Sequence, residues 1–266
     1  MKIVGTFLVL LFCGFSVYGQ NSPVPTQIVT DRPSFSASSR AVPYKALQIE
    51  TGFLVNVSKS ESSTDFGSST MSFPTPMVRW GVLKGVELRL FNTFFRKKDN
   101  HPSIPVDERN QYGLGNLIVG TKVNLTKAKG IIPEMAVLAH AVFQTGKVVV
   151  RESEKVLFDI AFSMTHPISD KYSLGYNLGY ASSEESANGN GFYSVIFGFG
   201  ISEKFSGFFE GFGLWKNFEN GTFNFDGGLS YSIKPNLQLD MAAGTGFTQR
   251  NYFITIGFSM LFAELY

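Results

Sequence analysis

Charged side chains recur at alternate positions inside apolar segments of this 266-residue sequence. Glu87 and Arg89, for example, stand between Val86, Leu88 and Leu90. Successive side chains of a strand point to opposite faces, so this spacing gathers the charges on one face. The seven acids and three bases expected on this polar face are Glu50, Arg79, Glu87, Arg89, Lys122, Glu134, Asp159, Glu210, Asp226 and Asp240.

The excess of acids on the polar face allows two interpretations. Unpaired carboxylates beside a water-filled interior would favour the passage of cations or polar amines. Alternatively, the acids pair with Arg79, Arg89 and Lys122 on neighbouring strands and simply satisfy a wet interior. We favour the second interpretation, because the inner faces of barrels are generally polar.

The three histidines raise the question of catalysis, because Ser–His esterases use a histidine base and a third group that orients it. His101 and His166 each precede a proline, which predicts a loop and a short turn. His140 falls in a predicted strand, on the polar face, and no serine stands at a recognisable spacing from it. We therefore predict that the chain is not an enzyme and that His140 faces the interior. A lipid hydrolase remains an alternative.

Other reactive groups are sparse. The single cysteine, Cys13, lies near the N-terminus, so the rest of the chain offers neither a disulfide nor a thiolate. No cluster of histidine, cysteine and carboxylate residues has metal-ligand spacing, and we expect no metal and no cofactor. The acidic segment 99–108 is expected to be a solvated loop rather than a Ca²⁺ site. The 23 basic and 21 acidic residues form no basic run, so nothing indicates a nucleic-acid partner.

The elements that position these groups are predicted to be β-strands, because alternation with a period of two persists from residue 46 to the C-terminal region. In one such segment Tyr172, Leu174 and Tyr176 alternate with polar and small residues. Each segment is close to the roughly 9–11 residues that a tilted membrane strand needs. The twelve predicted strands are 46–58, 74–82, 86–96, 113–125, 132–144, 154–165, 172–181, 192–201, 205–215, 222–232, 236–246 and 252–262.

The connections between these strands are sorted by length. Those after every second strand are short, as at 83–85 and 202–204. The others are mostly longer, as at 59–73 and 97–112. An even number of strands with short turns on one side and long loops on the other is typical of outer-membrane barrels, and it predicts that both termini are periplasmic.

Water must meet the charged face, because burying ten charges in a dry core would cost on the order of several kcal/mol each before pairing. The opposite face is then a continuous apolar wall, in keeping with the 27 Phe and 10 Tyr of the sequence. A soluble β-sandwich could cover such faces with protein, but the sorted connections favour lipid. Aromatic residues near strand ends would form belts at the membrane interfaces. These residues are Trp80, Phe94, Tyr172, Trp215, Tyr231, Tyr252 and Phe262.

Residues 1–19 are predicted to be a signal peptide. Lys2 precedes an apolar stretch over 3–17, and the residues that follow suit cleavage before Gln20. The apolar stretch is too short to span a membrane comfortably, so we expect it to be removed.

Residues 20–45 are rich in Pro, Ser and Thr and show no period, and we expect the barrel to occupy residues 46–266. A twelve-strand barrel lies between filled eight-strand barrels and open sixteen-strand porins, which predicts a narrow lumen. Residues 21–45, with Asp31, Arg32 and Arg40, could enter this lumen as a plug, in which Arg32, Arg40 and Lys45 would pair with some of the wall acids. A periplasmic tail is the equally plausible alternative.

Four motifs resemble the outer-membrane family named for the meta-pathway of phenol degradation, whose members are described as transporters. The motifs are Thr30-Asp31-Arg32-Pro33-Ser34-Phe35, Gln48-Ile49-Glu50-Thr51-Gly52-Phe53, the segment from Gly113 to Lys122, and Asn236-Leu237-Gln238-Leu239-Asp240. With the strand pattern, the resemblance runs from about Thr30 to Phe262. It implies a barrel and suggests the passage of small molecules.

We therefore predict an all-β, transmembrane antiparallel barrel of about 12 strands in the outer membrane of a Gram-negative-type bacterium. The predicted function is passive diffusion of small, hydrophobic or aromatic molecules. A structural or adhesive barrel and a lipid hydrolase are the alternatives. The expected partners are outer-membrane lipid, a small-molecule solute and the barrel-assembly machinery.

Overall fold

The structure is a computed structural model that describes residues 28–58, 67–106, 109–145, 155–184, 186–248 and 250–263. Within these ranges the chain is all β, and no helix is long and apolar enough to cross a membrane. The predicted signal peptide, residues 1–19, lies outside the described ranges.

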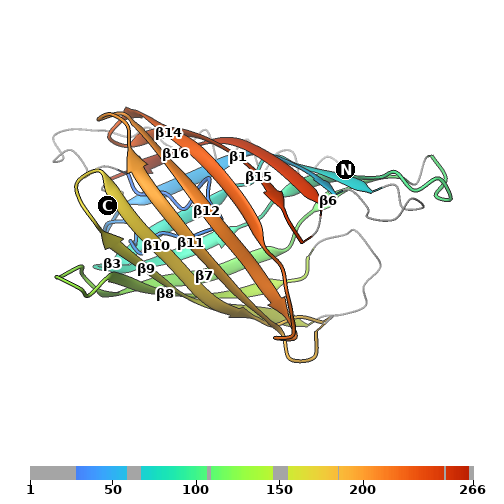
Figure 1. The fold of residues 1–266 in the computed structure, drawn as a ribbon, viewed down its shortest axis with the longest axis horizontal. Helices are drawn as coiled ribbons and strands as arrows, with labels where there is room; N and C mark the ends of the chain where they lie inside the picture. Colours follow the sequence, from blue (N-terminus) through green and yellow to red (C-terminus); the bar gives the residue numbers. More distant parts are fainter. Residues whose placement is uncertain are drawn as a thin grey trace.

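The strands form one antiparallel sheet that closes on itself (Figure 1). The closing seam joins β1 (Leu47–Ser58) to β16 (Asn251–Phe262) over their full lengths, from the pair Leu47–Phe262 to the pair Ser58–Asn251. Closure leaves no open sheet edge along the seam, which is what a strand structure in hydrocarbon requires.

The wall has twelve positions, which confirms the predicted all-β antiparallel barrel of about 12 strands. Nine positions hold a single strand and three are divided into two pieces, namely β2 with β3, β4 with β5, and β6 with β7; β13 is a short addition to β12. The remaining bounds are β2 (Ser68–Ser72), β3 (Met77–Leu83), β4 (Val86–Phe91), β5 (Phe94–Asp99), β6 (Asn110–Leu114), β7 (Leu117–Thr126), β8 (Glu134–Phe143), β9 (Val156–Pro167), β10 (Tyr172–Ala181), β11 (Asn190–Gly200), β12 (Phe205–Lys216), β13 (Asn220–Gly221), β14 (Asn224–Lys234) and β15 (Leu237–Gly246).

The division between β2 and β3 has a local cause in the sequence. Pro74 and Pro76 fall between β2 and β3, and proline lacks the amide hydrogen that a ladder needs. β1 therefore pairs with β3 at its start and with β2 at its end. At the next break, the Gly115 amide donates to the Thr93 carbonyl at 2.7 Å and holds the two divided positions together.

These divisions correct three of the predicted boundaries. We expected continuous strands over 86–96 and 113–125, but each is interrupted, after Phe91 and after Leu114. We also assigned residues 59–73 to a loop, whereas β2 occupies part of that range. His166, expected in a turn, lies near the end of β9.

The two faces of the wall differ as the alternation predicts. On the outer face of β9, Phe158, Ile160 and Phe162 are 55%, 42% and 45% exposed, whereas the inward Ser163 is fully buried. An exposed apolar face of this kind continues around the barrel, and a single closed sheet leaves no second sheet to cover it. The sandwich alternative is therefore wrong, and lipid is the natural partner of this surface.

Aromatic pairs lie on the wall near the short turns. Tyr172 stacks on Phe197 with ring centroids 5.8 Å apart, and Phe205 lies 4.6 Å from Tyr231. Rings at the ends of strands are the arrangement expected at a membrane interface.

Candidate functional site

Residues 28–45, called the N-terminal segment from here on, cross the inside of the barrel without forming a strand (Figure 1). A chain in this position must satisfy its amides without a ladder. Side chains of the wall accept seven of them. Asp31 N and Arg32 N donate to Glu50 of β1, Phe35 N and Ser36 N to Glu210 of β12, Ala37 N to Asn177 of β10, Ala41 N to Asn124 of β7, and Val42 N to Glu87 of β4.

A buried charge cluster connects the segment to β1, β3, β4 and β7. Arg79 Nη1 lies 2.7 Å from Glu50 Oε1, and Arg79 Nε lies 2.9 Å from Glu87 Oε1. All three residues are fully buried. The sheet register makes these contacts possible. Arg79 of β3 pairs with Arg89 of β4, and Glu87 is two residues from Arg89 on the same face of β4. Buried ions of this kind must be paired closely to be tolerated.

Asp31 of the N-terminal segment completes this cluster. Its Oδ2 lies 2.7 Å from Arg89 Nη1, and its Oδ1 lies 3.0 Å from Lys122 Nζ. The wall contributes three bases and two acids to the cluster, so Asp31 supplies the third acid that balances it. Burial by itself would raise the pKa of Asp31, but Arg79, Lys122 and Arg89 together hold this pKa well below its usual value.

Arg32 bridges the closing seam of the barrel. Its backbone amide donates to Glu50 on β1, while its Nη2 lies 3.1 Å from Asp240 Oδ1 on β15 and 2.9 Å from Thr255 Oγ1 on β16. Gly52 and Gly257 make room for the guanidinium, since a Cβ at either position would collide with it.

The segment makes two further polar contacts with the wall acids. Glu210 accepts hydrogen bonds from Phe35 N and Ser36 N, each at 2.7 Å, and from the Ser36 hydroxyl. Arg40 Nε lies 2.9 Å from Glu134 Oε2, although the Arg40 side chain is 59% exposed. Both arginines singled out in the sequence therefore contact acids of the wall.

The other predicted interior residues behave differently. His140 and Asp159 are opposite each other on β8 and β9, with His140 Nδ1 2.7 Å from Asp159 Oδ1. This His–Asp pair resembles two thirds of a catalytic triad, but within the described ranges no serine hydroxyl bonds the His140 ring. Within those ranges no group of histidine, cysteine and carboxylate side chains is arranged to hold a metal.

Two pockets lie on opposite sides of the Arg32–Phe35 stretch and share Arg32, Pro33 and Ser34 as lining residues. The loop-side pocket, near the long-loop ends of the strands, has a volume of about 370 Å³. The turn-side pocket, about 560 Å³, reaches the short turns and is lined by many serines and glycines.

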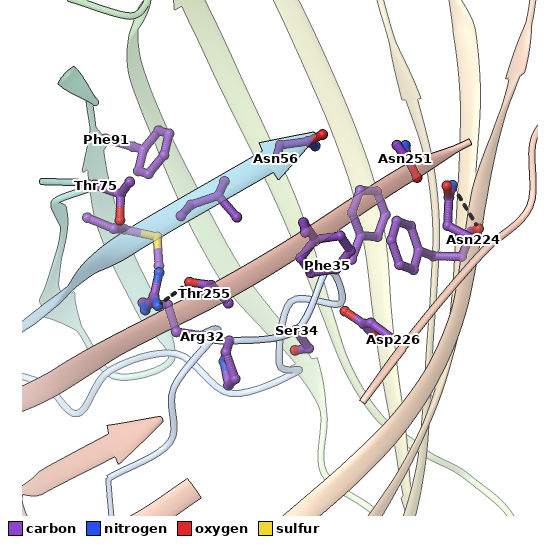
Figure 2. A pocket seen from close by; sticks show the side chains of 15 residues that line it. Arg32, Ser34, Phe35, Asn56, Thr75, Phe91, Asn224, Asp226, Asn251 and Thr255 are labelled. Carbon is purple, nitrogen blue, oxygen red and sulfur yellow. Dashed lines mark hydrogen bonds between the residues drawn. The ribbon is translucent and has the colours of Figure 1, made fainter. Parts of the chain in front are cut away.

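Figure 2 shows the loop-side pocket in detail. Phe35 occupies its middle, with three asparagines on one side and Arg32, Ser34 and Asp226 on the other. Its apolar lining comes from Phe35, Phe91, Phe212, Phe253, Leu54 and Met77.

A closed twelve-strand barrel with an apolar outer face and a polar interior defines the class of outer-membrane β-barrel proteins, and this chain lies in the outer membrane. Residues 30–262 match the family described as the MetA-pathway of phenol degradation, and the chain belongs to this family. The match confirms the resemblance seen in the sequence. No curated protein matches the chain.

Solved structures share the fold at low sequence identity. The COG4313 outer membrane channel from Pseudomonas putida F1 has a TM-score of 0.67 and 11% identity, covering 86% of this chain and all (100%) of that one. The KdgM porin in complex with disordered oligogalacturonate has a TM-score of 0.50 and 8% identity, covering 80% and 98%. The NanC porin has a TM-score of 0.50 and 10% identity, covering 80% and 98%.

Proposed function

We propose that the protein is a passive channel for small apolar or aromatic molecules, in which the N-terminal segment acts as a plug that narrows the lumen. The observation that carries the proposal is the pair of pockets that share Arg32, Pro33 and Ser34 as lining residues. A solute that passes this stretch moves from the long-loop side to the short-turn side. The channel names of the similar barrels agree with this function.

The lining of the two pockets suits solutes that are small and partly apolar. Four phenylalanines line the loop-side pocket, whereas the turn-side pocket has seven serines, three glycines and five charged residues beside its three phenylalanines. Ligand pockets are usually apolar with a few polar groups that orient the ligand. The solute would therefore bind at the aromatic side first and leave through the polar side.

The test is flux across asymmetric vesicles whose outer leaflet is lipopolysaccharide, which apolar solutes cross slowly by themselves. Vesicles with the purified protein should take up labelled benzyl alcohol faster than empty vesicles. A Phe35→Ala variant should widen the constriction and raise the rate about threefold to tenfold, as expected when a barrier falls by roughly 1 kcal/mol. Phe158→Ala, on the lipid-facing surface, is the matched control and should leave the rate unchanged.

Equal uptake by protein-containing and empty vesicles would contradict the channel function. An unchanged rate in Phe35→Ala would instead show that the constriction lies elsewhere along the lumen.

A further inference from the structure

We propose that the loop-side pocket binds an organic ammonium ion, with the ammonium group at Asp226 and its apolar or aromatic body among the phenylalanine rings. The inference names a solute class for the proposed channel and depends on that function for its meaning in transport. Binding itself can be measured without transport.

Asp226 is a buried carboxylate that lacks a hydrogen-bond donor. Its residue is 1% exposed, it lines the loop-side pocket, and within the described ranges no N–H or hydroxyl group donates to either oxygen, although the Glu210 carboxyl group is within hydrogen-bonding reach. Figure 2 shows the side chain beside Ser34 and Phe35. Buried polar groups are almost always hydrogen-bonded, so a carboxylate left in this state indicates that a ligand supplies the donor.

The neighbouring Glu210 explains why Asp226 remains without a donor. The two residues are directly opposite on β12 and β14. Glu210 takes the nearby donors of the N-terminal segment, because Phe35 N, Ser36 N and the Ser36 hydroxyl all bond to its carboxylate. Two carboxyl groups this close hold one proton between them, so the pair carries at least one negative charge.

The positive charge at the pocket does not cancel these acids. Arg32 is the one cation among the lining residues, and its Nη2 is already 3.1 Å from Asp240 Oδ1. Because the charge of Arg32 is neutralised by Asp240, the pair of Asp226 and Glu210 still carries at least one unbalanced negative charge. The pocket is therefore complementary to a monovalent cation.

The rest of the lining favours an organic cation over an inorganic one. Phe35 and Phe212 stack with centroids 4.5 Å apart and planes 12° apart, and Phe253 lies 6.5 Å from Phe212. The faces of such rings attract ammonium groups and pack against apolar bodies. A volume of about 370 Å³ suits a single ring with a short amine chain.

The proposal is tested by titrating the purified, detergent-solubilised protein calorimetrically with benzylamine and with benzyl alcohol, a neutral molecule of nearly the same shape. At pH 7 benzylamine is an ammonium ion, and we expect it to bind about tenfold more tightly than the alcohol, as a charge-assisted hydrogen bond implies. Benzoate, which reverses the charge, should bind more weakly than either.

Asp226→Asn should abolish the preference for benzylamine over benzyl alcohol, because it keeps the shape of the side chain and removes the carboxylate that the ammonium group would contact. Asp159→Asn is the matched control, since Asp159 is an acid paired with His140 and does not line the pocket. This variant should keep the tenfold preference. The slower migration of unfolded barrels on gels reports whether each variant is folded.

Equal binding of benzylamine and benzyl alcohol by the native protein would overturn the proposal. An undiminished preference in folded Asp226→Asn would overturn it as well. If benzylamine binds but no solute crosses vesicles, the channel function fails while the ammonium site stands. If benzyl alcohol crosses the vesicles but the protein binds benzylamine no more tightly than benzyl alcohol, the ammonium site fails while the channel function stands.

Discussion

At the scale of single residues, Asp31 carries a charge that the wall lacks. Arg79, Arg89 and Lys122 face only Glu50 and Glu87, so the cluster is balanced only when the segment is docked. Sequence reasoning expected arginines of the segment to neutralise acids of the wall. Arg32 does form an ion pair with Asp240. The reverse also occurs, because Asp31 of the segment neutralises bases of the wall such as Arg89.

Replacing Asp31 by Asn should destabilise the protein by about 3–5 kcal/mol, because one buried base then lacks its partner. The measurement is the free energy of unfolding by urea in detergent. Asp170→Asn, in an exposed turn, is the control and should change the value by less than about 0.5 kcal/mol. Equal stability of the two variants would show that Asp31 is not required for the balance.

The depressed pKa of Asp31 also predicts a dependence on pH. In the folded state the pKa of Asp31 lies well below its usual value of 3.8. The contribution of Asp31 to the free energy of unfolding is therefore fully present above about pH 4. It should be lost as the pH falls from that value through the lower pKa of the folded state. Thermal unfolding followed by circular dichroism between pH 6 and pH 2.5 should show this loss in the native protein. In Asp31→Asn the contribution of this residue should be absent, so the curve should be flatter.

At the scale of elements, most strands could be predicted because one face meets lipid and the other meets polar groups. Strands such as β9 and β16 therefore alternate without exception along most of their length. Pro74 and Pro76 mark the division between β2 and β3. The other two divisions could not be predicted, because Thr93 and Gly115 fit an uninterrupted strand locally and their mutual hydrogen bond defines the break. The path of the N-terminal segment was equally hidden, since several of its contacts join residues more than 80 positions apart.

The segment can be locked to the wall by a disulfide. Ser36 and Ser194 have hydroxyl oxygens 2.6 Å apart, so cysteines at both positions, in a chain with Cys13→Ser, should be close enough to join. If the segment moves during passage, oxidation should lower benzyl alcohol uptake at least fivefold and reduction should restore it. Ser36→Cys alone is the control. Unchanged uptake after complete oxidation would show that solute passes a static segment.

At the scale of the whole molecule, lipid rather than protein covers the apolar face of the wall. An arginine at Ile256, in the middle of β16 and 55% exposed, should therefore destabilise the barrel in lipid vesicles by about 2–4 kcal/mol. The same substitution at Ile131, which is 92% exposed near a short turn, should cost less than about 1 kcal/mol. Equal effects at the two sites, measured by urea unfolding in vesicles, would contradict a membrane position at β16.

The bridge that Arg32 makes has a consequence for how the barrel comes apart. One residue holds β1 by its backbone and β15 and β16 by its side chain. Separating β1 from β15 and β16 therefore breaks the contacts of Arg32 with one of the two sides. Withdrawing the segment removes the contacts by which Arg32 joins them. We therefore expect opening of the seam between β1 and β16 and release of the N-terminal segment to be coupled during unfolding.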